Sequence, residues 1–587
     1  MKLYKFLILI FLACLICSLI SCNGGESQTD EVLNTENTEE GGSEKATVDP
    51  ESMKNKFSIF LDGEYLCKVV YPERATAVEK ELYNKVRERL KTKTGKLPAM
   101  TTDFLAYNDT GESRDEPAIL VGKTNYKESE QVYADLAYGE ARIEIVGNKL
   151  VIAFSSEIDA NYIFLRFIGL TNKGSSLYLG IDENAREVSV SNKNLAKIPR
   201  FPYSSPEIFT CEEDSFLLCA AKATEEQLDG YCEIAVEKGY QQTDRKKIGD
   251  NTFVTLKNDE SYLYVYYTKH DSAIKIAGGS LSMYAEPDRS SGLEETYTPY
   301  IASIPQPNNG QGYILRLPDG RFIIHDGGYS GGDRVYNTLK SLESGHITIA
   351  AWFISHPHGD HYPAFIDFLR DHGKDEDITI ECLAFNYAGP EVYDLSNSAG
   401  KENVSNQVEK LYSSIKMYNP GLNVIKVHTG QTLNFGSVSV EILYTVEDIL
   451  PRVLPNVNDS SLVIRVNVDG QSLLLLADTC YDSGPIMKQL WGNHLKSDIV
   501  QIAHHGMWPS VEDIYHLIQG ETVLFPATHA NMKNDLFDTR WGATINAALK
   551  YAKDIYISGD SVQIIELPHI IENNKEATME YVKNYQK

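Results

Sequence analysis

Three observations predict an α/β protein of several domains. The chain has 587 residues, which is too long for a single hydrophobic core. All 14 histidines fall at or after His270, and this shift in composition separates a C-terminal part from what precedes it. In both parts, short apolar runs bounded by polar turns occur together with helical patterns, as expected of sheets covered by helices.

The first module is expected over residues 55–197. Runs 57–61 and 65–70 are predicted strands around an Asp-Gly turn, and apolar residues four apart between 77 and 91 predict an amphipathic helix. A Gly-Asn turn at 147–148 predicts a hairpin.

A second module is expected over residues 205–285. A capping box at Thr224 predicts a helix that extends to about Lys238. The aromatic run 262–267 is predicted to be a strand with one buried face, and a sugar-stacking platform is the alternative.

The most informative segment of the C-terminal part, residues 355–361, reads Ser-His-Pro-His-Gly-Asp-His and directly follows the apolar run 347–354. Three imidazoles and one carboxylate fall close together here, namely those of His356, His358, Asp360 and His361. Borderline metals such as zinc prefer these ligands, and a turn after a strand can direct several of them at one point. The segment therefore predicts a metal site, and a solvated histidine-rich loop is the alternative.

Further candidate ligands also follow apolar, strand-like runs: Asp326, Asp478, His504 and His505. Open α/β sheets commonly place their chemistry at strand ends. Each residue taken alone is more often an ordinary turn residue. Together with the histidine-rich segment, they predict one shared centre.

In this order the motifs resemble the metallo-β-lactamase superfamily, which has Asp, then HxHxDH, then Asp, then His. The resemblance covers residues 298–570 and implies an αββα sandwich, preceded by the two smaller α/β (α+β) modules. Asn458-Asp459-Ser460-Ser461 and His504-His505-Gly506 are similar to segments of competence DNA-uptake hydrolases and cell-wall phosphorylcholine esterases.

The resemblance implies a role for each residue of the HxHxDH motif. His356 and His358 match the histidines that hold a first metal ion. Asp360 and His361 match the ligands of a second ion, and Asp360 is also a candidate catalytic residue.

The resemblance also assigns the later motifs. Asp478 matches a carboxylate that bridges the two ions. One of His504 and His505 matches the last imidazole, and we slightly favour His505. Asp326 matches a carboxylate that orients the ligands without binding metal.

One departure from the family pattern affects the first metal position. Many members place a further His between the HxHxDH motif and the bridging Asp, but this interval holds only His372 and His428, which we interpret as structural. Asn458 or Asp459 stands in the expected place. The first position is therefore weaker, filled by an oxygen ligand, or empty.

The resemblance implies a Zn²⁺ enzyme with one or two ions, with Mn²⁺ as the alternative. A divalent ion lowers the pKa of bound water to about 7, so we expect a metal-bound hydroxide to attack a phosphodiester or another ester. The expected substrate is a small molecule or a cell-wall polymer. His529, after the run 522–525, is a candidate for protonating the leaving group or contacting substrate.

Residues 1–21 have the form of a bacterial lipoprotein signal peptide. Lys2 and Lys5 precede an apolar run that ends in Leu-Ile-Ser-Cys, which resembles a lipobox with Cys22 as the acylated residue. A single-pass anchor is the alternative. Residues 22–54 contain few large apolar side chains and are predicted to be a flexible tether. The expected location is the extracellular face of the cell membrane.

The formal net charge is −27, and residues 1–21 carry two lysines and no acid, so their removal would make the chain still more negative. Such a field repels polyanions and disfavours nucleic acid as a substrate. Two alternatives to an ester hydrolase remain: a nuclease of the DNA-uptake type, and a non-catalytic surface binding lipoprotein with a degenerate hydrolase fold.

Overall fold

The computed structural model describes residues 53–105, 114–172, 175–210, 215–331, 333–394, 396, 404–507, 511–537 and 542–586. The expected signal peptide 1–21, the expected lipidation site Cys22 and nearly all of the tether 22–54 lie outside these residues. None of the helices in the described ranges is long and apolar enough to cross a membrane. The five cysteines of these ranges are buried, and none of them forms a disulfide bond within the described residues.

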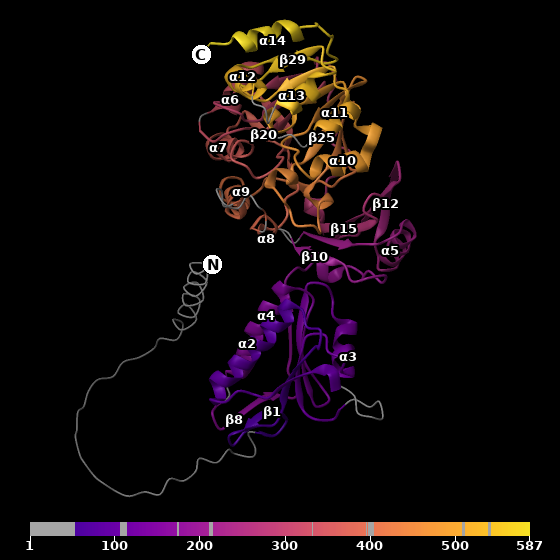
Figure 1. The fold of residues 1–587 in the computed structure, drawn as a ribbon, viewed down its shortest axis with the longest axis vertical. Coiled ribbons are helices and arrows are strands. Elements are labelled where there is room, and N and C mark those ends of the chain that lie inside the picture. Colours follow the sequence, from indigo (N-terminus) through magenta and orange to yellow (C-terminus); the bar gives the residue numbers. More distant parts are fainter. Residues whose placement is uncertain are drawn as a thin grey trace, which may run out of the picture. The chain divides into compact units, whose positions relative to one another are not determined.

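The first module is an α/β unit built on a six-stranded sheet (Figure 1). One apolar core joins this sheet to α2 and α4, and a second core joins it to α3, so both faces of the sheet are covered. A smaller three-stranded sheet completes the unit. The sheet orders are β4-β3-β5-β7-β6-β9 and β2-β1-β8, with β1 Lys56–Leu61, β2 Glu64–Tyr65, β3 Lys68–Tyr71, α2 Ala77–Thr94, β4 Met100–Thr102, β5 Ala118–Val121, α3 Lys127–Asp135, β6 Glu140–Val146, β7 Lys149–Phe154, α4 Glu157–Thr171, β8 Tyr178–Asp182 and β9 Arg186–Val190.

Local signals account for most of these elements. Thr76 and Glu79 form a capping box that begins α2, and Gly95, with a φ of 77°, ends it. The predicted strand 65–70 is divided, because β2 pairs with β1 while β3 enters the larger sheet.

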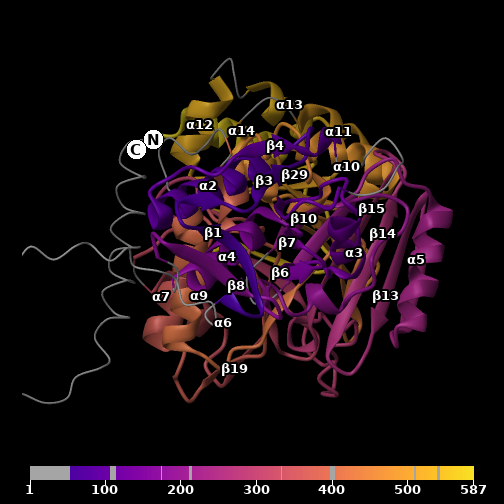
Figure 2. The same ribbon diagram turned by 90° about the horizontal axis from the view of Figure 1, so that it is seen from below.

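The second module is an antiparallel sheet with one helix on it. Figure 2 shows α5 along β13, β14 and β15, and the Thr224 capping box begins this helix as predicted. The sheet order is β10-β11-β15-β14-β13-β12, with β10 Glu207–Thr210, β11 Phe216–Ala220, α5 Glu225–Glu237, β12 Gln241–Ile248, β13 Asn251–Lys257, β14 Ser261–Thr268 and β15 Ala273–Ser280.

Strand β14 is buried on both faces. Leu263, Val265 and Tyr267 belong to the core under α5. The alternate residues, Tyr262, Tyr264 and Tyr266, pack into the core of the C-terminal part. The Tyr262 hydroxyl lies 3.0 Å from His428 Nε2. The sugar-stacking alternative is therefore wrong. The predicted strand is confirmed, but both of its faces are buried, because its tyrosines form an interface within the chain.

The C-terminal part contains two large sheets. The first has the order β22-β21-β19-β18-β17-β16-β30 with β20 on β19, and the second has the order β23-β24-β25-β26-β27-β28-β29. Strands β18 and β19 are parallel, as are β26, β27 and β28. The strands are β16 Tyr300–Ser303, β17 Gly312–Arg316, β18 Phe322–Asp326, β19 Ile347–Phe353, β20 Ile378–Ile380, β21 Leu383–Phe385, β22 Val424–Lys426, β23 Thr432–Phe435, β24 Val438–Tyr444, β25 Val463–Val468, β26 Gln471–Leu475, β27 Ile499–Gln501, β28 Thr522–Phe525, β29 Asp554–Ile557 and β30 Ile564–Glu566.

Alternate residues of these strands enter different cores. Ile323, Ala351 and Phe353 lie in the core between the sheets, whereas Phe322, Ile324 and Trp352 lie in the core under the helices. Helices α6, α7 and α9 pack side by side, and α10, α11 and α13 form another group (Figure 1). The main helices are α6 Arg334–Leu342, α7 Pro363–His372, α9 Val404–Tyr418, α10 Ser483–Trp491, α11 Glu512–Ile518, α12 His529–Phe537, α13 Gly542–Leu549 and α14 Lys575–Asn584.

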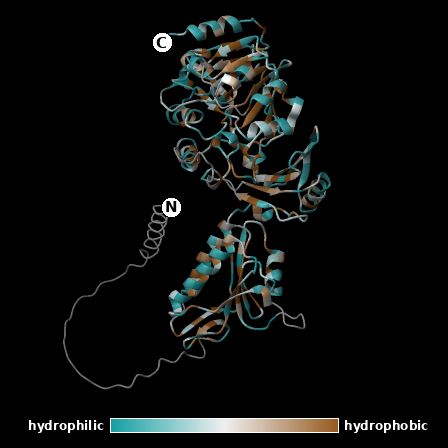
Figure 3. Cartoon of the chain, viewed as in Figure 1, coloured by the Kyte–Doolittle hydropathy of each residue, from teal (hydrophilic) through white to brown (hydrophobic). Residues whose placement is uncertain are grey.

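This arrangement is an αββα sandwich, so the predicted fold class is confirmed. In Figure 3 the strands inside it are largely hydrophobic. Beyond residue 570 the chain continues into α14, which packs on α12 and β29. The polar segments that follow β18, β19, β26 and β27 are those that the sequence marks as candidate ligands, and two of them come from each sheet.

Candidate metal centre

Two groups of ligand atoms share the carboxylate of Asp478. In each group the nitrogen and oxygen atoms all lie within 4.8 Å of one another. The first group is His356, His358 and Asp478, and the second is Asp360, His361, Asp478 and His505.

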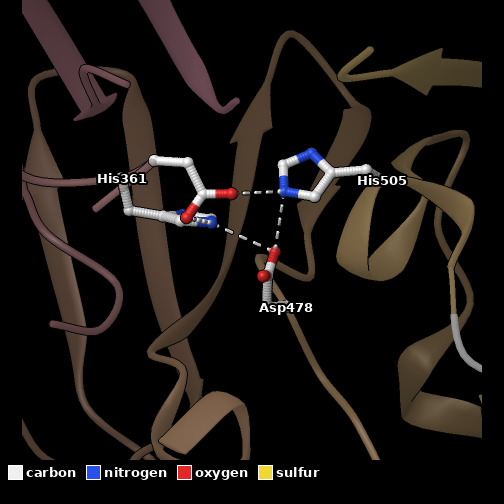
Figure 4. Close-up of side chains that lie close together, drawn as sticks. His361, Asp478 and His505 are labelled. Atoms are coloured by element: carbon white, nitrogen blue, oxygen red, sulfur yellow. Dashed lines mark ion pairs between the residues drawn. The ribbon is translucent and has the colours of Figure 1, made fainter. Parts of the chain in front are cut away.

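Figure 4 shows three members of the second group, His361, Asp478 and His505. Asp478 Oδ1 lies 3.2 Å from His361 Nε2 and 3.5 Å from His505 Nε2. His505 Nε2 also lies 3.3 Å from Asp360 Oδ2. The side chains of His361, His505 and Asp478 point toward one another from two sheets, although the two histidines are 144 positions apart in the sequence.

The first group lies on the other oxygen of Asp478. His356 Nε2 is 3.8 Å from Asp478 Oδ2 and 3.0 Å from His358 Nδ1. His356 is fully buried and His358 is half-buried. The two groups therefore lie next to each other, with one carboxylate oxygen facing each.

Unpaired atoms show that these residues suit a cation. Within the described ranges, His361 Nε2, His505 Nε2 and Asp478 Oδ1 are buried and make no hydrogen bond. Buried polar atoms in proteins are nearly always paired, and leaving them unpaired costs free energy. Imidazole nitrogen and carboxylate oxygen are zinc ligands, so an ion between them would satisfy all three atoms.

Hydrogen bonds on the far side of each ring fix which nitrogen faces the centre. His361 Nδ1 lies 2.8 Å from Asp326 Oδ2, and His505 Nδ1 lies 2.8 Å from the carbonyl oxygen of Pro526. With Nδ1–H donating, each Nε2 keeps its lone pair for a metal. Asp326 thus takes the orienting place that the resemblance implies. It is itself held by the backbone N–H and the hydroxyl of Ser355, both 2.8 Å away.

Asn458 and Asp459, the residues in the place of the missing family His, have different surroundings. The Asn458 amide nitrogen is 3.1 Å from His504 Nε2, so Asn458 borders the centre. Asp459 Oδ1 instead accepts hydrogen bonds from the backbone N–H groups of Asp482 and Ser483, each at 2.9 Å, at the start of α10. Asp459 Oδ1 thus caps a helix, whereas Asp459 Oδ2 is buried without a hydrogen bond among the described residues.

The charges of the centre favour cation binding. Burial would raise the pKa of Asp478, but His361, His504 and His505 hold the pKa well below its usual range. Burial and the neighbouring His361 lower the pKa of His356 well below its usual value, which keeps that ring neutral. Burial acts to lower the pKa of His361, but Asp478, Asp360 and Asp326 raise it well above the usual value. Metal ligation requires the neutral form of each ring, so an ion at this centre would compete with protons for the ring nitrogens.

The remaining histidine candidates lie in other environments. His529 Nδ1 pairs with Asp560, and its ring lies against Tyr581 of α14 and against Tyr585, which follows that helix. None of these residues belongs to the two ligand groups. His428 Nδ1 lies 2.8 Å from Glu447. His372 Nδ1 lies 2.9 Å from Asp375 at the end of α7.

Two positioning residues are absent from the sequence predictions. The Ser461 hydroxyl accepts the backbone N–H of Asp478 at 3.2 Å and lies 3.4 Å from His356 Nδ1. Ser355 precedes the HxHxDH motif, and its hydroxyl lies 3.0 Å from His356 Nδ1. Their positions beside the motifs are the only sequence signal of these roles.

Comparisons with solved structures find weak similarities. The metallo-β-lactamase fold protein YhfI from Bacillus subtilis is 14% identical over 45% of this chain and 99% of its own, with a TM-score of 0.28. The diiron β-hydroxylase CmlA from Streptomyces venezuelae is 14% identical over 46% of this chain and 45% of its own, with a TM-score of 0.24. The flavodiiron protein from Giardia intestinalis is 13% identical over 47% of this chain and 51% of its own, with a TM-score of 0.21.

This chain therefore spans about half the length of the last two proteins. No family model matches the chain, and no curated protein matches it. The αββα layers, with ligand candidates after strands of both sheets, nevertheless define the architecture. The C-terminal fold is an αββα sandwich, the layering that the resemblance of the sequence motifs implies.

Proposed function

We propose that the C-terminal sandwich is a metal-dependent hydrolase that cleaves a phosphodiester or another ester. The observation that carries this proposal is the pair of ligand groups that share Asp478. A divalent ion held there lowers the pKa of a coordinated water to about 7 and stabilises charge on the attacking and leaving oxygens.

The residues of the chain divide the work. Asp326 and the Pro526 carbonyl hold the rings of His361 and His505 in fixed orientations. The Asp360 side chain is 22% exposed, whereas that of Asp478 is 2% exposed. Asp360 therefore borders the solvent side, where it can take a proton from the attacking water.

The two ligand groups lie next to each other, and this supports a phosphate ester as substrate, because charge develops on both the attacking and the leaving oxygen. Neighbouring cation sites suit in-line displacement at phosphorus, and the Asn458–Ser461 and His504-His505-Gly506 segments resemble those of phosphate-ester hydrolases. The net charge of −27 disfavours a nuclease, because a polyanion would be repelled.

We also propose that the enzyme is held on the outer face of the cell membrane through an acylated Cys22. The basic and apolar segment before this cysteine supports the proposal. Labelling with a radioactive fatty acid should mark the wild type but not Cys22→Ala, and a wild type without label would contradict the anchor.

Metal analysis and turnover of bis(p-nitrophenyl) phosphate by the purified chain without residues 1–21 test the activity. We expect bound zinc or manganese and hydrolysis that is lost in Asp478→Asn but kept in His516→Ala, a control at an exposed position of α11. A protein that holds metal but cleaves no phosphodiester, phosphomonoester or carboxylic ester would be a binding lipoprotein. Degradation of single-stranded DNA would identify a nuclease.

A further inference from the structure

The two histidines of the His504-His505 doublet lie on different oxygens of Asp478. His505 Nε2 is 3.5 Å from Oδ1, the oxygen that also faces His361. His504 Nε2 is 3.6 Å from Oδ2, the oxygen that also faces His356. The doublet thus contributes one imidazole to each side of the shared carboxylate.

The backbone of the doublet is unusual. His504 has φ 49° and ψ 46°, and His505 has φ 56° and ψ 19°, so two consecutive non-glycine residues occupy the left-handed region. Each such residue costs free energy and persists only where its surroundings demand it. This conformation turns both neighbouring side chains toward Asp478, and an extended backbone would send them to opposite sides.

The surroundings of His504 resemble those of a ligand. The residue is only 8% exposed. The Asn458 amide nitrogen lies 3.1 Å from its Nε2 and 3.4 Å from its Nδ1, and the Asn458 side-chain oxygen is buried without a hydrogen bond among the described residues. Amide nitrogen and oxygen exchange places by rotation. A rotated Asn458 could accept the Nδ1–H of His504, the kind of hydrogen bond that metal-ligating histidines commonly make.

We infer that His504 is the third imidazole of the first metal position and replaces the histidine that the chain lacks earlier in its sequence. The first ion would be held by His356, His358 and His504 with Asp478 Oδ2, and the second by Asp360, His361 and His505 with Asp478 Oδ1. This inference rests on the metal centre of the proposed function, but not on any particular substrate. It assigns two ions to each chain.

Metal content tests the inference without turnover. The wild-type chain loaded with Zn²⁺ and dialysed should keep two ions by elemental analysis. His504→Ala should keep one ion, bound by the second group. His516→Ala, the control in α11, should keep two. Two ions in His504→Ala, or one in the wild type, would overturn the inference.

A cysteine variant gives a positive signal even if His504→Ala folds poorly. His504→Cys loaded with Co²⁺ should show a thiolate-to-cobalt charge-transfer absorption, because a thiolate would replace the imidazole on the ion. The wild type and His516→Cys should lack this band. Its absence from a folded, Co²⁺-loaded His504→Cys protein would show that residue 504 does not touch metal. Two ions without hydrolysis would uphold the inference while refuting the proposed function.

Discussion

Individual side chains outside the ligand groups decide which ring nitrogen faces the centre. Asp326 does this for His361, and its own backbone has a φ of 57°. Asparagine tolerates this conformation better than most residues. Asp326→Asn therefore removes the charge without a new backbone strain, which makes it a suitable probe of orientation.

We predict that Asp326→Asn weakens metal binding by roughly 10–100-fold while the fold is retained. The neutral amide can no longer hold the proton of His361 Nδ1 as a carboxylate does. Competition with a fluorescent zinc chelator measures the affinity. Asp288→Asn is the control, because Asp288 has an exposed carboxylate that accepts a hydrogen bond from the backbone N–H of Ser290. Equal affinities for both variants would remove Asp326 from this role.

At the scale of residues, the sequence predicts the HxHxDH ligands well because they are close together after one strand. It does not distinguish His504 from His505, since the left-handed backbone directs both toward Asp478. It also does not separate Asn458 from Asp459. The two residues are neighbours in a short 3₁₀ turn, so their side chains point in different directions, and that of Asp459 reaches the first residues of α10.

At the scale of elements, cross-strand polar pairs stabilise the second sheet of the sandwich. Glu441 in β24 lies opposite Arg465 in β25, with Oε2 2.8 Å from Arg465 Nη2. Although burial acts to raise it, hydrogen bonds from His494, Arg465 and Asn467 and the charge of Arg465 lower the pKa of Glu441 to about 2.

We predict that Glu441→Gln costs roughly 2–3 kcal/mol of unfolding free energy near neutral pH. Because the folded-state pKa is depressed, this contribution is fully present above about pH 4.3, the ordinary glutamate value. It is lost as the pH falls from there toward 2. Urea unfolding of both proteins between pH 7 and pH 3.5 should show a constant difference that shrinks only below about pH 4.5.

The matched control for this series is Glu237→Gln, at an exposed position near the end of α5. It should follow the wild type at every pH. A difference between Glu441→Gln and the wild type that does not change with pH would show that packing, and not charge, causes the loss.

The tyrosine-bearing face of β14 gives a second prediction at this scale. Tyr262→Phe leaves the buried His428 Nε2 without its hydroxyl partner, which should cost about 1–3 kcal/mol. Tyr267→Phe, on the opposite face of the strand, should cost less. Urea unfolding can be followed by the fluorescence of Trp491, whose ring stacks on Phe253 at 6.0 Å in the same core.

Equal destabilisation by both substitutions would show that the Tyr262 hydroxyl contributes nothing to the interface.

The strands and helices themselves are largely predictable from caps, turns and apolar spacing, as α2, α5 and the β6–β7 hairpin show. The second buried face of β14 is not predictable from the sequence, because tyrosine is equally suited to a solvent-exposed surface and to a buried, hydrogen-bonded interface.

At the scale of the whole molecule, the charge of −27 acts on every anionic substrate. We predict that kcat/KM for bis(p-nitrophenyl) phosphate rises with ionic strength, because salt screens the repulsion between substrate and protein. The rate for a neutral ester such as p-nitrophenyl acetate should change little. A fall of kcat/KM with salt for the phosphodiester would instead indicate a local basic surface that attracts it.

The centre takes its side chains from both sheets of the sandwich. A bound cation would therefore link the two sheets, which otherwise meet through a largely apolar core and a few hydrogen bonds such as the one between Tyr313 and Ser558. Stripping the ion should shorten the lifetime of the folded sandwich while the module at 55–197, which has its own cores, melts as before. Metal supply would then govern how long each enzyme molecule survives as well as how fast it works.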